Sequence, residues 1–184
     1  MNEYKNELDR YRDLYKVAEK GGVVFFGSTF AKNIPAAELG QALQLNCSVY
    51  NRSFSDLSVF DALEILDEAV LTLYPKKIIL HLGEIDIERG YKSIEEISAA
   101  YEQLVLRIKK FDKRIKIIIA SMCSEEKGSD QLNAALEKLS SKCRCQYADI
   151  SKAKESEAPF ISAFKMLKFF MLDRITFYDA MNLA

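Results

Sequence analysis

The chain has 184 residues and a mass of 21.0 kDa, 49% of its residues are hydrophobic, and 26 basic residues nearly balance 27 acidic ones. This size fits a single globular domain over residues 1–184 with a sizeable core. The balanced charge and the lack of a basic block interleaved with aromatics argue against a nucleic-acid partner or an anionic membrane surface.

The N-terminal segment MNEYKNELDRYRDLYKVAEK is charged and amphipathic, which is typical of neither a signal peptide nor a membrane span. No later apolar run reaches spanning length, so we expect a cytoplasmic protein. Its four cysteines, which we expect to be reduced and structural, show no CxxC spacing: Cys47, Cys123, Cys143 and Cys145.

Helical and strand periodicities alternate along the chain. We expect helices over residues 3–19, 35–45, 57–73, 92–111, 129–141 and 159–171, and strands over 23–27, 47–51, 76–82, 114–120 and 145–149. The strands are continuous apolar runs, such as KKIILHLG and RIKIIIAS, which is typical of a parallel sheet covered by helices on both faces. The pattern predicts an α/β chain with three layers, α/β/α.

Short polar motifs follow the first three predicted strands. They are Gly27-Ser28-Thr29, the stretch NRSFSD from Asn51 to Asp56, and Gly83-Glu84-Ile85-Asp86. The carboxyl ends of parallel strands share one edge of the sheet, where ligands bind and nucleophiles lie. We therefore expect these motifs to gather at one edge.

This order of motifs resembles the SGNH (GDSL-type) hydrolases, a family of esterases and acylhydrolases. The family carries Gly-Asp-Ser after the first strand, Asn-x-x-x-Ser-Gly after the second, Gly-x-Asn-Asp after the third and Asp-x-x-His near the C-terminus. The counterpart of the last block is Asp173-Arg174-Ile175-Thr176. The resemblance spans nearly the whole chain and implies a flavodoxin-like five-stranded sheet in the order 2-1-3-4-5.

The resemblance places the family's nucleophilic Ser on Thr29 and its general-base His on Thr176. It places the oxyanion-hole Gly and Asn on Asp56 and Ile85. None of these four positions keeps the family's residue, whereas the frame does match at Gly27, Asn51, Ser55, Gly83, Asp86 and Asp173. Acyl transfer needs a base and donors for the developing oxyanion, and an ionised carboxylate at position 56 would repel that charge.

Two interpretations of the hydroxyl pair remain open. Ser28 or Thr29 is either a nucleophile shifted by one residue or a cap for the turn and the next helix. A working nucleophile would need an unorthodox base such as His81, the only histidine, or Asp86. We favour His81 as a neutral core residue and Asp86 as a brace for its loop, while Asp173 is equally a structural residue or a remnant of the catalytic set.

We expect a non-catalytic relative that binds a small polar ligand or a partner through the former active-site crevice. Carboxylates at Asp56, Glu84, Asp86 and Asp173 favour hydroxyl-rich, cationic or metal ligands over phosphates, although no His/Cys cluster predicts a transition-metal site and no cofactor is expected. The alternatives are an active esterase or acylhydrolase that uses Ser28 or Thr29, and a structural assembly subunit.

The C-terminal segment APFISAFKMLKFFMLDRITFYDAMNLA contains five of the 11 phenylalanines. Two apolar faces follow from helical spacing: one comprises Phe160, Phe164, Leu167 and Met171, and the other Met166, Phe169 and Phe170. One face can pack on the sheet. The other needs cover from the N-terminal helix or from a second subunit, so we expect a homodimer through this segment as one possibility.

Overall fold

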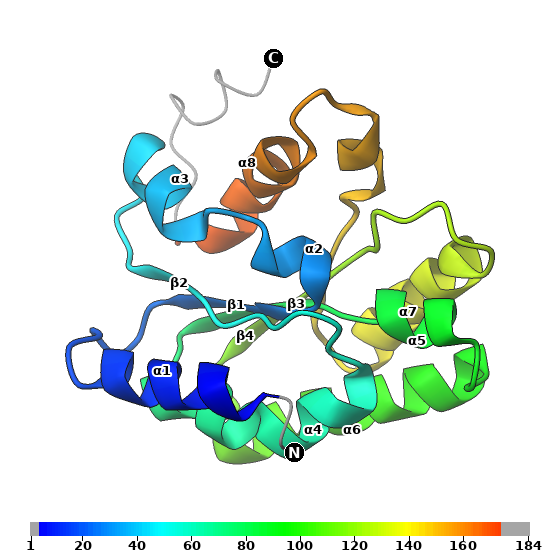
Figure 1. The fold of residues 1–184 in the computed structure, drawn as a ribbon, viewed down its shortest axis with the longest axis horizontal. Helices are drawn as coiled ribbons and strands as arrows, with labels where there is room; N and C mark the ends of the chain where they lie inside the picture. The colour runs from blue at the N-terminus through cyan, green and yellow to red at the C-terminus, as the bar shows by residue number, and fades with distance from the viewer. Residues whose placement is uncertain (1–3, 174–184) are drawn as a thin grey trace.

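A computed structural model describes residues 4–173 of the chain (Figure 1). Its sheet has five parallel strands in the order β2-β1-β3-β4-β5, as the resemblance implies. The strands are β1 (Val23–Gly27), β2 (Val49–Asn51), β3 (Lys77–His81), β4 (Lys116–Ala120) and β5 (Gln146–Ala148). Their bounds lie within one or two residues of the predicted runs.

Helices cover both faces of the sheet, which gives three layers (Figure 1). One face carries α1 (Lys5–Tyr15), α4 (Val59–Ala69), α6 (Ile94–Phe111) and α7 (Ser129–Lys142), which share one hydrophobic cluster. The other carries α3 (Ala36–Ala42) and α8 (Pro159–Met171), which share a second cluster. Every residue of β1 and β3 is buried between these layers, as expected for strands without a polar face.

Local signals in the sequence explain where the long helices begin. The Ser93 side chain accepts the Glu96 N–H while the Glu96 carboxylate accepts the Ser93 N–H, a capping box that starts α6. Ser58 caps α4 by accepting the Asp61 N–H at 3.0 Å. These caps satisfy N–H groups that the first helical turn leaves without partners.

The helix predicted over residues 57–73 is divided, because α4 ends at Ala69 and a 3₁₀ turn, η1 (Leu71–Leu73), follows it. Three short elements were not predicted: α2 (Thr29–Lys32), α5 (Glu84–Arg89) and the 3₁₀ turn η2 (Ser151–Glu155). Each is too short for a helical period to show in the sequence. Two of them matter for the site, because α2 and α5 directly follow β1 and β3.

The N-terminal helix does not cover the second apolar face of the C-terminal helix α8, which was one of the two expectations. The N-terminal helix α1 lies on the opposite face of the sheet from α8, so it does not cover the second apolar face (Figure 1). Leu39 and Leu43, in and just after α3, pack into the cluster that holds Met166 and Phe170. Within residues 4–173, no helix combines the length and hydropathy needed to span a bilayer.

Candidate functional site

The ends of β1 and β3 form the centre of the carboxyl edge. Gly27 pairs in register with His81, and the Ser28 N–H donates to the His81 carbonyl at 3.0 Å. A Cβ at position 27 would lie 2.4 Å from the His81 carbonyl oxygen and 2.7 Å from the Ala31 Cβ. Glycine is therefore required at position 27, because a side chain there would collide with both β3 and α2.

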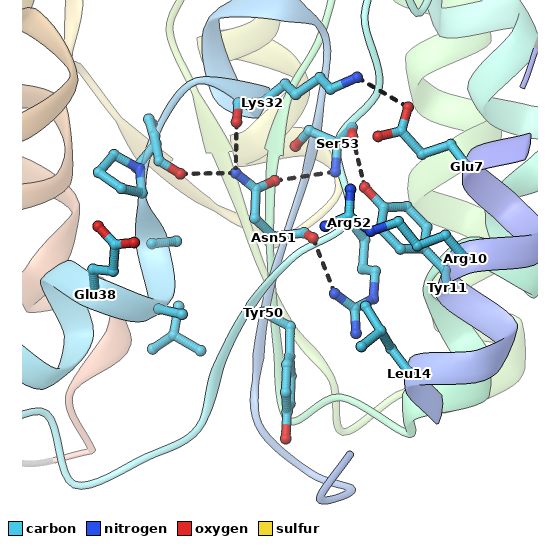
Figure 2. A pocket seen from close by; sticks show the side chains of 15 residues that line it. Glu7, Arg10, Tyr11, Leu14, Lys32, Glu38, Tyr50, Asn51, Arg52 and Ser53 are labelled. Carbon is cyan, nitrogen blue, oxygen red and sulfur yellow. Dashed lines mark hydrogen bonds and ion pairs between the residues drawn. The ribbon is translucent and has the colours of Figure 1, made fainter. Parts of the chain in front are cut away.

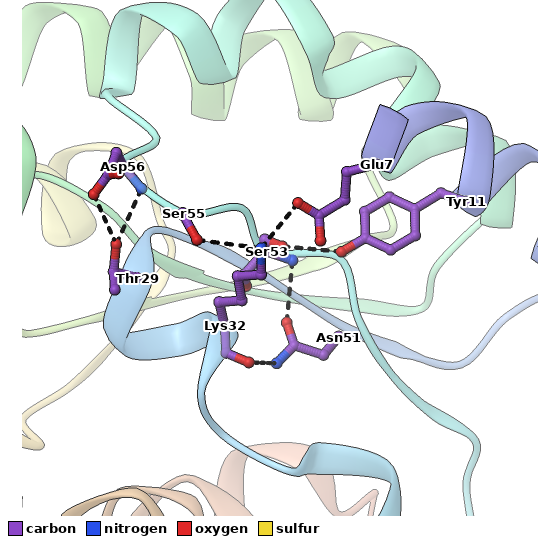
Figure 3. Close-up of polar contacts among 8 residues, drawn as sticks. All are labelled: Glu7, Tyr11, Thr29, Lys32, Asn51, Ser53, Ser55 and Asp56. Carbon is purple, nitrogen blue, oxygen red and sulfur yellow. Dashed lines mark hydrogen bonds and ion pairs between the residues drawn. The ribbon is translucent and has the colours of Figure 1, made fainter. Parts of the chain in front are cut away.

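The Thr29 hydroxyl is bonded twice to Asp56 (Figure 3). Asp56 donates its backbone N–H to Thr29 Oγ1 at 3.0 Å, and Thr29 Oγ1 donates to Asp56 Oδ1 at 3.2 Å. Thr29 is the first residue of α2, and Asp56 lies in the exposed loop after β2. The hydroxyl that the resemblance assigns to the nucleophile position thus has a donor and an acceptor within its own chain, and both belong to Asp56.

The backbone of Asp56 supports its match with the family's glycine. Its φ is 55°, in the left-handed region that favours glycine and that asparagine and aspartate tolerate best among other residues. The Asp56 carbonyl accepts from the Tyr4 hydroxyl at 3.3 Å, which ties the loop to the segment before α1. The loop thus has a backbone conformation that favours glycine, but it carries a carboxylate side chain at this position.

Asn51 joins the loop after β2 to α2 (Figure 3). Its amide nitrogen donates to the carbonyls of Ala31 at 2.7 Å and Ile34 at 3.0 Å, and its Oδ1 accepts the Ser53 N–H at 3.1 Å. These bonds use both ends of the amide. Asn51 therefore holds the frame of the edge and offers little to a ligand.

Helix α1 is fastened to the same loop. Lys32 Nζ lies 3.0 Å from Glu7 Oε2 and donates to Ser55 Oγ at 3.2 Å, and the Tyr11 hydroxyl donates to the Ser53 carbonyl at 2.9 Å (Figure 3). Burial is the main cause that raises the pKa of Tyr11, so this phenol stays a donor at all ordinary pH values.

Ser28 and His81 are both buried, with exposed fractions of 0% and 2%. Within the described residues, the Ser28 hydroxyl and both ring nitrogens of His81 lack a hydrogen-bond partner. The His81 ring stacks on Phe30, with ring centroids 5.1 Å apart, and its Nε2 lies 3.8 Å from Glu84 Oε1. No Ser–His hydrogen bond is formed, so the pair does not have the geometry of an activated nucleophile.

The start of α5 carries the remaining residues of the third motif. Glu84 is half-buried, and Ile85 is 7% exposed and has no side-chain donor. Asp86 Oδ2 accepts the N–H of Val59, the first residue of α4, at 3.0 Å. Burial raises the pKa of Asp86, and the Val59 N–H opposes that shift. Asp86 thus braces the start of α4, the role implied by the resemblance.

Asp173 does not join the other site residues. Its Oδ1 lies 3.0 Å from Nζ of Lys77, the first residue of β3, whereas His81 ends that strand at the carboxyl edge. Four residues of strand correspond to about 13 Å. The Lys77 hydrogen bond holds the pKa of Asp173 below its usual range. Of the two interpretations of Asp173, the structure therefore favours a structural residue and not a member of the catalytic set. Thr176 lies outside the described residues.

The chain returns to the carboxyl edge after β5, in residues 149–158. Asp149 there accepts from the Ser121 hydroxyl at 3.2 Å and from the Ser151 hydroxyl at 2.7 Å, which lowers the pKa of Asp149. The stretch contains carboxylates but no histidine. Asp149 was not singled out in the sequence, although its place directly after a predicted strand is the signal that could have found it.

A cavity of about 330 Å³ lies beside this edge, between α1, α3 and β2 (Figure 2). Arg10, Lys32, Glu38 and Tyr50 are among its lining residues. The cavity also adjoins Arg52, which sequence reasoning missed. Arg52 is 5% exposed, and its guanidinium carbon lies 4.7 to 5.5 Å from the rings of three tyrosines, namely Tyr11, Tyr15 and Tyr50.

Arg52 Nη1 also donates to the Asn51 carbonyl at 3.1 Å, on the edge strand β2. The buried cation therefore fastens α1 to the sheet through cation–π contacts. No group of three or more His, Cys, Asp or Glu side chains within residues 4–173 is placed to hold a metal ion.

Comparison with known proteins supports this geometry at the level of the fold. No family model matches the sequence, and no curated protein sequence matches it. Solved structures match at high probability. A Streptococcus pneumonia protein provisionally named a platelet activating factor superposes with a TM-score of 0.79 at 16% identity, over 93% of this chain and 94% of that one.

Two further neighbours are named as hydrolases. A GDSL-like lipase from Bacteroides thetaiotaomicron has a TM-score of 0.72 at 14% identity, over 89% of this chain and 96% of its own. An acetylxylan esterase from Geobacillus stearothermophilus has a TM-score of 0.66 at 17% identity, over 85% and 97%. The chain therefore has the three-layer fold of the SGNH hydrolases, and the suspected resemblance is supported.

Proposed function

We propose that this chain is a non-hydrolytic member of the SGNH fold group that binds a small polar ligand at the carboxyl edge of its sheet. The observation that carries the proposal is the pair of hydrogen bonds between Thr29 and Asp56. With Thr29 and Asp56 assigned to the family's nucleophile and oxyanion-hole positions, these bonds put a carboxylate beside the nucleophile and engage a backbone N–H that would serve the oxyanion. A hydroxyl held in this way ties the start of α2 to the loop after β2, whereas Ser28, at the N-cap position of α2, makes no capping hydrogen bond.

The comparison with a catalytic neighbour sharpens the proposal. Two structures of the Geobacillus esterase are described as catalytic mutants in which a serine or a histidine is replaced by alanine. Here the single histidine lies buried against Phe30 without a hydrogen bond to either hydroxyl, within the described residues. A base and a nucleophile that do not touch cannot share a proton.

The ligand class follows from the groups that remain accessible. Ser55 and Asp56 are exposed and Glu84 is half-buried, so the edge offers a hydroxyl and two carboxylates. Such acceptors suit a ligand rich in hydroxyl groups. Acetylated xylobiose is a suitable probe, because the Geobacillus neighbour and a second neighbour are both named as acetylxylan esterases.

One experiment tests binding and turnover together. Acetylated xylobiose is titrated into ¹⁵N-labelled protein, amide shifts are recorded, and acetate release is followed in the same tube. We expect shifts at residues 29, 56 and 84 without acetate release above the buffer rate. Acetate release that disappears in the S28A/T29A variant would establish hydrolysis and overturn the proposal. Shifts confined to Arg10 and Tyr50 would place the ligand in the neighbouring cavity instead.

A general ester substrate provides a second readout. We expect the parent and the S28A/T29A variant to hydrolyse p-nitrophenyl acetate at the same slow rate. The alternative, an active esterase that uses Ser28 or Thr29, requires the variant to be clearly slower. The single variants S28A and T29A would then show which hydroxyl carries the activity.

A further inference from the structure

The amino-terminal edge of the sheet, opposite the proposed site, gathers positive charge. Lys20, Lys76, Arg114 and Lys116 line a cavity of about 510 Å³ there, together with the buried Lys77. Asp112 and Asp173 are the only carboxylates among its described lining residues. The chain as a whole is nearly neutral, so this is a local concentration of charge.

Both carboxylates are already paired. Asp112 accepts from Arg114 Nε at 3.0 Å and from Nη2 at 2.8 Å, which lowers the pKa of Asp112 to about 2. Asp173 pairs with Lys77 at 3.0 Å. In residues 4–173, no carboxylate lies within ion-pair distance of Lys20, Lys76 or Lys116. These three lysines therefore form no ion pair with a described residue, although Lys20 Nζ lies over the Tyr74 ring, 4.7 Å from its centroid.

Lys77 shows how an anion fits there. Its ammonium group has three donors, of which two go to the carbonyls of Met171 at 2.6 Å and Leu172 at 2.8 Å. The third partner is Asp173, whose side chain is 75% exposed. The positive charges of Lys116 and Lys76 also help to lower the pKa of Asp173. This exposed carboxylate marks a position that favours negative charge and that a ligand anion can take over.

The rest of the cavity is apolar. Tyr74, Pro75 and Ile115 contribute to its lining, and Tyr74 is 57% exposed as a residue. Its ring packs against Phe111, with ring centroids 5.6 Å apart. A volume of about 510 Å³ is in the range of small-molecule sites.

We propose that this cavity binds a small molecule that carries a phosphate or a carboxylate on an apolar body, with its anionic group among Lys76, Lys77 and Lys116 and its apolar part against Tyr74 and Ile115. The site is separate from the proposed carboxyl-edge site, since the two lie at opposite ends of β3. Its charge is opposite to that of the exposed carboxylates at the carboxyl edge, so the two sites select different ligands.

The test is an amide-shift titration of the full chain at low ionic strength with four probes. Phenyl phosphate and benzoate carry both an anion and a ring, inorganic phosphate carries only the anion, and benzyl alcohol carries only the ring. We expect saturable shifts at residues 74, 76, 77 and 114–116, with phenyl phosphate or benzoate binding more tightly than the other two probes. The order of these two probes identifies the preferred anion.

Two variants and a control make the assignment specific. K76A/K116A should weaken binding of the preferred probe by about twofold to thirtyfold, because it removes two exposed positive charges beside the anionic group. D173N should strengthen binding, because it removes the competing carboxylate while Lys77 keeps both carbonyl bonds. K127A/K138A removes the same charge from exposed positions elsewhere and should leave the affinity unchanged.

Three outcomes would overturn the proposal. The first is a lack of saturable shifts with all four probes. The second is an equal loss of affinity in K76A/K116A and K127A/K138A, which would show attraction by net charge alone. The third is weaker binding in D173N. Tighter binding of a short oligonucleotide than of phenyl phosphate, at equal ionic strength, would assign the surface to nucleic acid and reject a small-molecule site.

Discussion

Replacement of Asp56 by Gly and by Ala would separate its backbone conformation from its hydrogen bond. Both variants lose the bond that the Thr29 hydroxyl donates to the carboxylate. They differ in the cost of the left-handed backbone, with a φ of 55°. For a residue with a Cβ this cost is about 1–2 kcal/mol relative to Gly, and the greater freedom of Gly in the unfolded chain offsets about 0.4–1 kcal/mol.

The Gly variant should therefore exceed the Ala variant in free energy of unfolding by about 1 kcal/mol. The Ala variant should have a free energy of unfolding about 0.5–1.5 kcal/mol below that of the parent, because both carry a Cβ and only the parent makes the hydrogen bond. Urea unfolding followed by circular dichroism measures both differences, provided that the three proteins share one m-value. In thermal unfolding, 1 kcal/mol corresponds to about 2–4 °C for a chain of this size.

Gln103 provides the control, because it is exposed in the middle of α6. In a helix interior the order reverses, and Q103G should be less stable than Q103A by about 1 kcal/mol. If D56A proves as stable as D56G while this control behaves as expected, residue 56 does not adopt the left-handed conformation. Its match with the family's glycine would then fail, and so would the interpretation of Thr29 as the family's nucleophile position.

Three further outcomes are expected. T29V should lose roughly 1–2 kcal/mol of stability, because it lacks the hydroxyl that makes two hydrogen bonds to Asp56, whereas T29S keeps the hydroxyl and the stability; equal losses in thermal unfolding would contradict these two hydrogen bonds. The lowered pKa of Asp173 stabilises the fold above its ordinary pKa of about 3.9, and this stabilisation is lost as pH falls through the folded value. D173N should flatten stability against pH below about pH 4, and an unchanged profile would exclude the Lys77 pair. Burial raises the pKa of Cys123 to about 12, so iodoacetamide at pH 8 should modify it far more slowly in the folded protein than in urea, as mass spectrometry of the peptide would show.

The fold could be predicted because several signals agree. Continuous apolar strands alternate with amphipathic helices, and only a covered parallel sheet buries both patterns. The strand ends were located well enough to bring Gly27 beside His81. The short helices α2 and α5 were missed because four and six residues give no measurable helical period.

The site was less predictable, because it depends on backbone conformation and on contacts between distant segments. The left-handed φ of Asp56 and its two bonds to Thr29 leave no trace in the sequence. Asp173 was aligned on a single residue of a block that lacked its histidine, so nothing fixed the edge to which it belonged. Net charge likewise could not show that Lys20, Lys76 and Lys116, far apart in sequence, would line one cavity.

The matching frame residues do not discriminate between an enzyme and a binding protein. Gly27 admits a close strand, Asn51 bonds α2 to a loop and Asp86 holds the start of α4, and each contact stabilises the fold with or without catalysis. The positions that must stabilise a transition state are different, because they need unoccupied donors and a base in reach. At the carboxyl edge the Thr29 hydroxyl and the Asp56 N–H already bond to each other, whereas Lys76 and Lys116 of the amino edge form no ion pair with a described residue. Donors and charges without a partner in the chain therefore indicate where it can bind a ligand better than the family resemblance does.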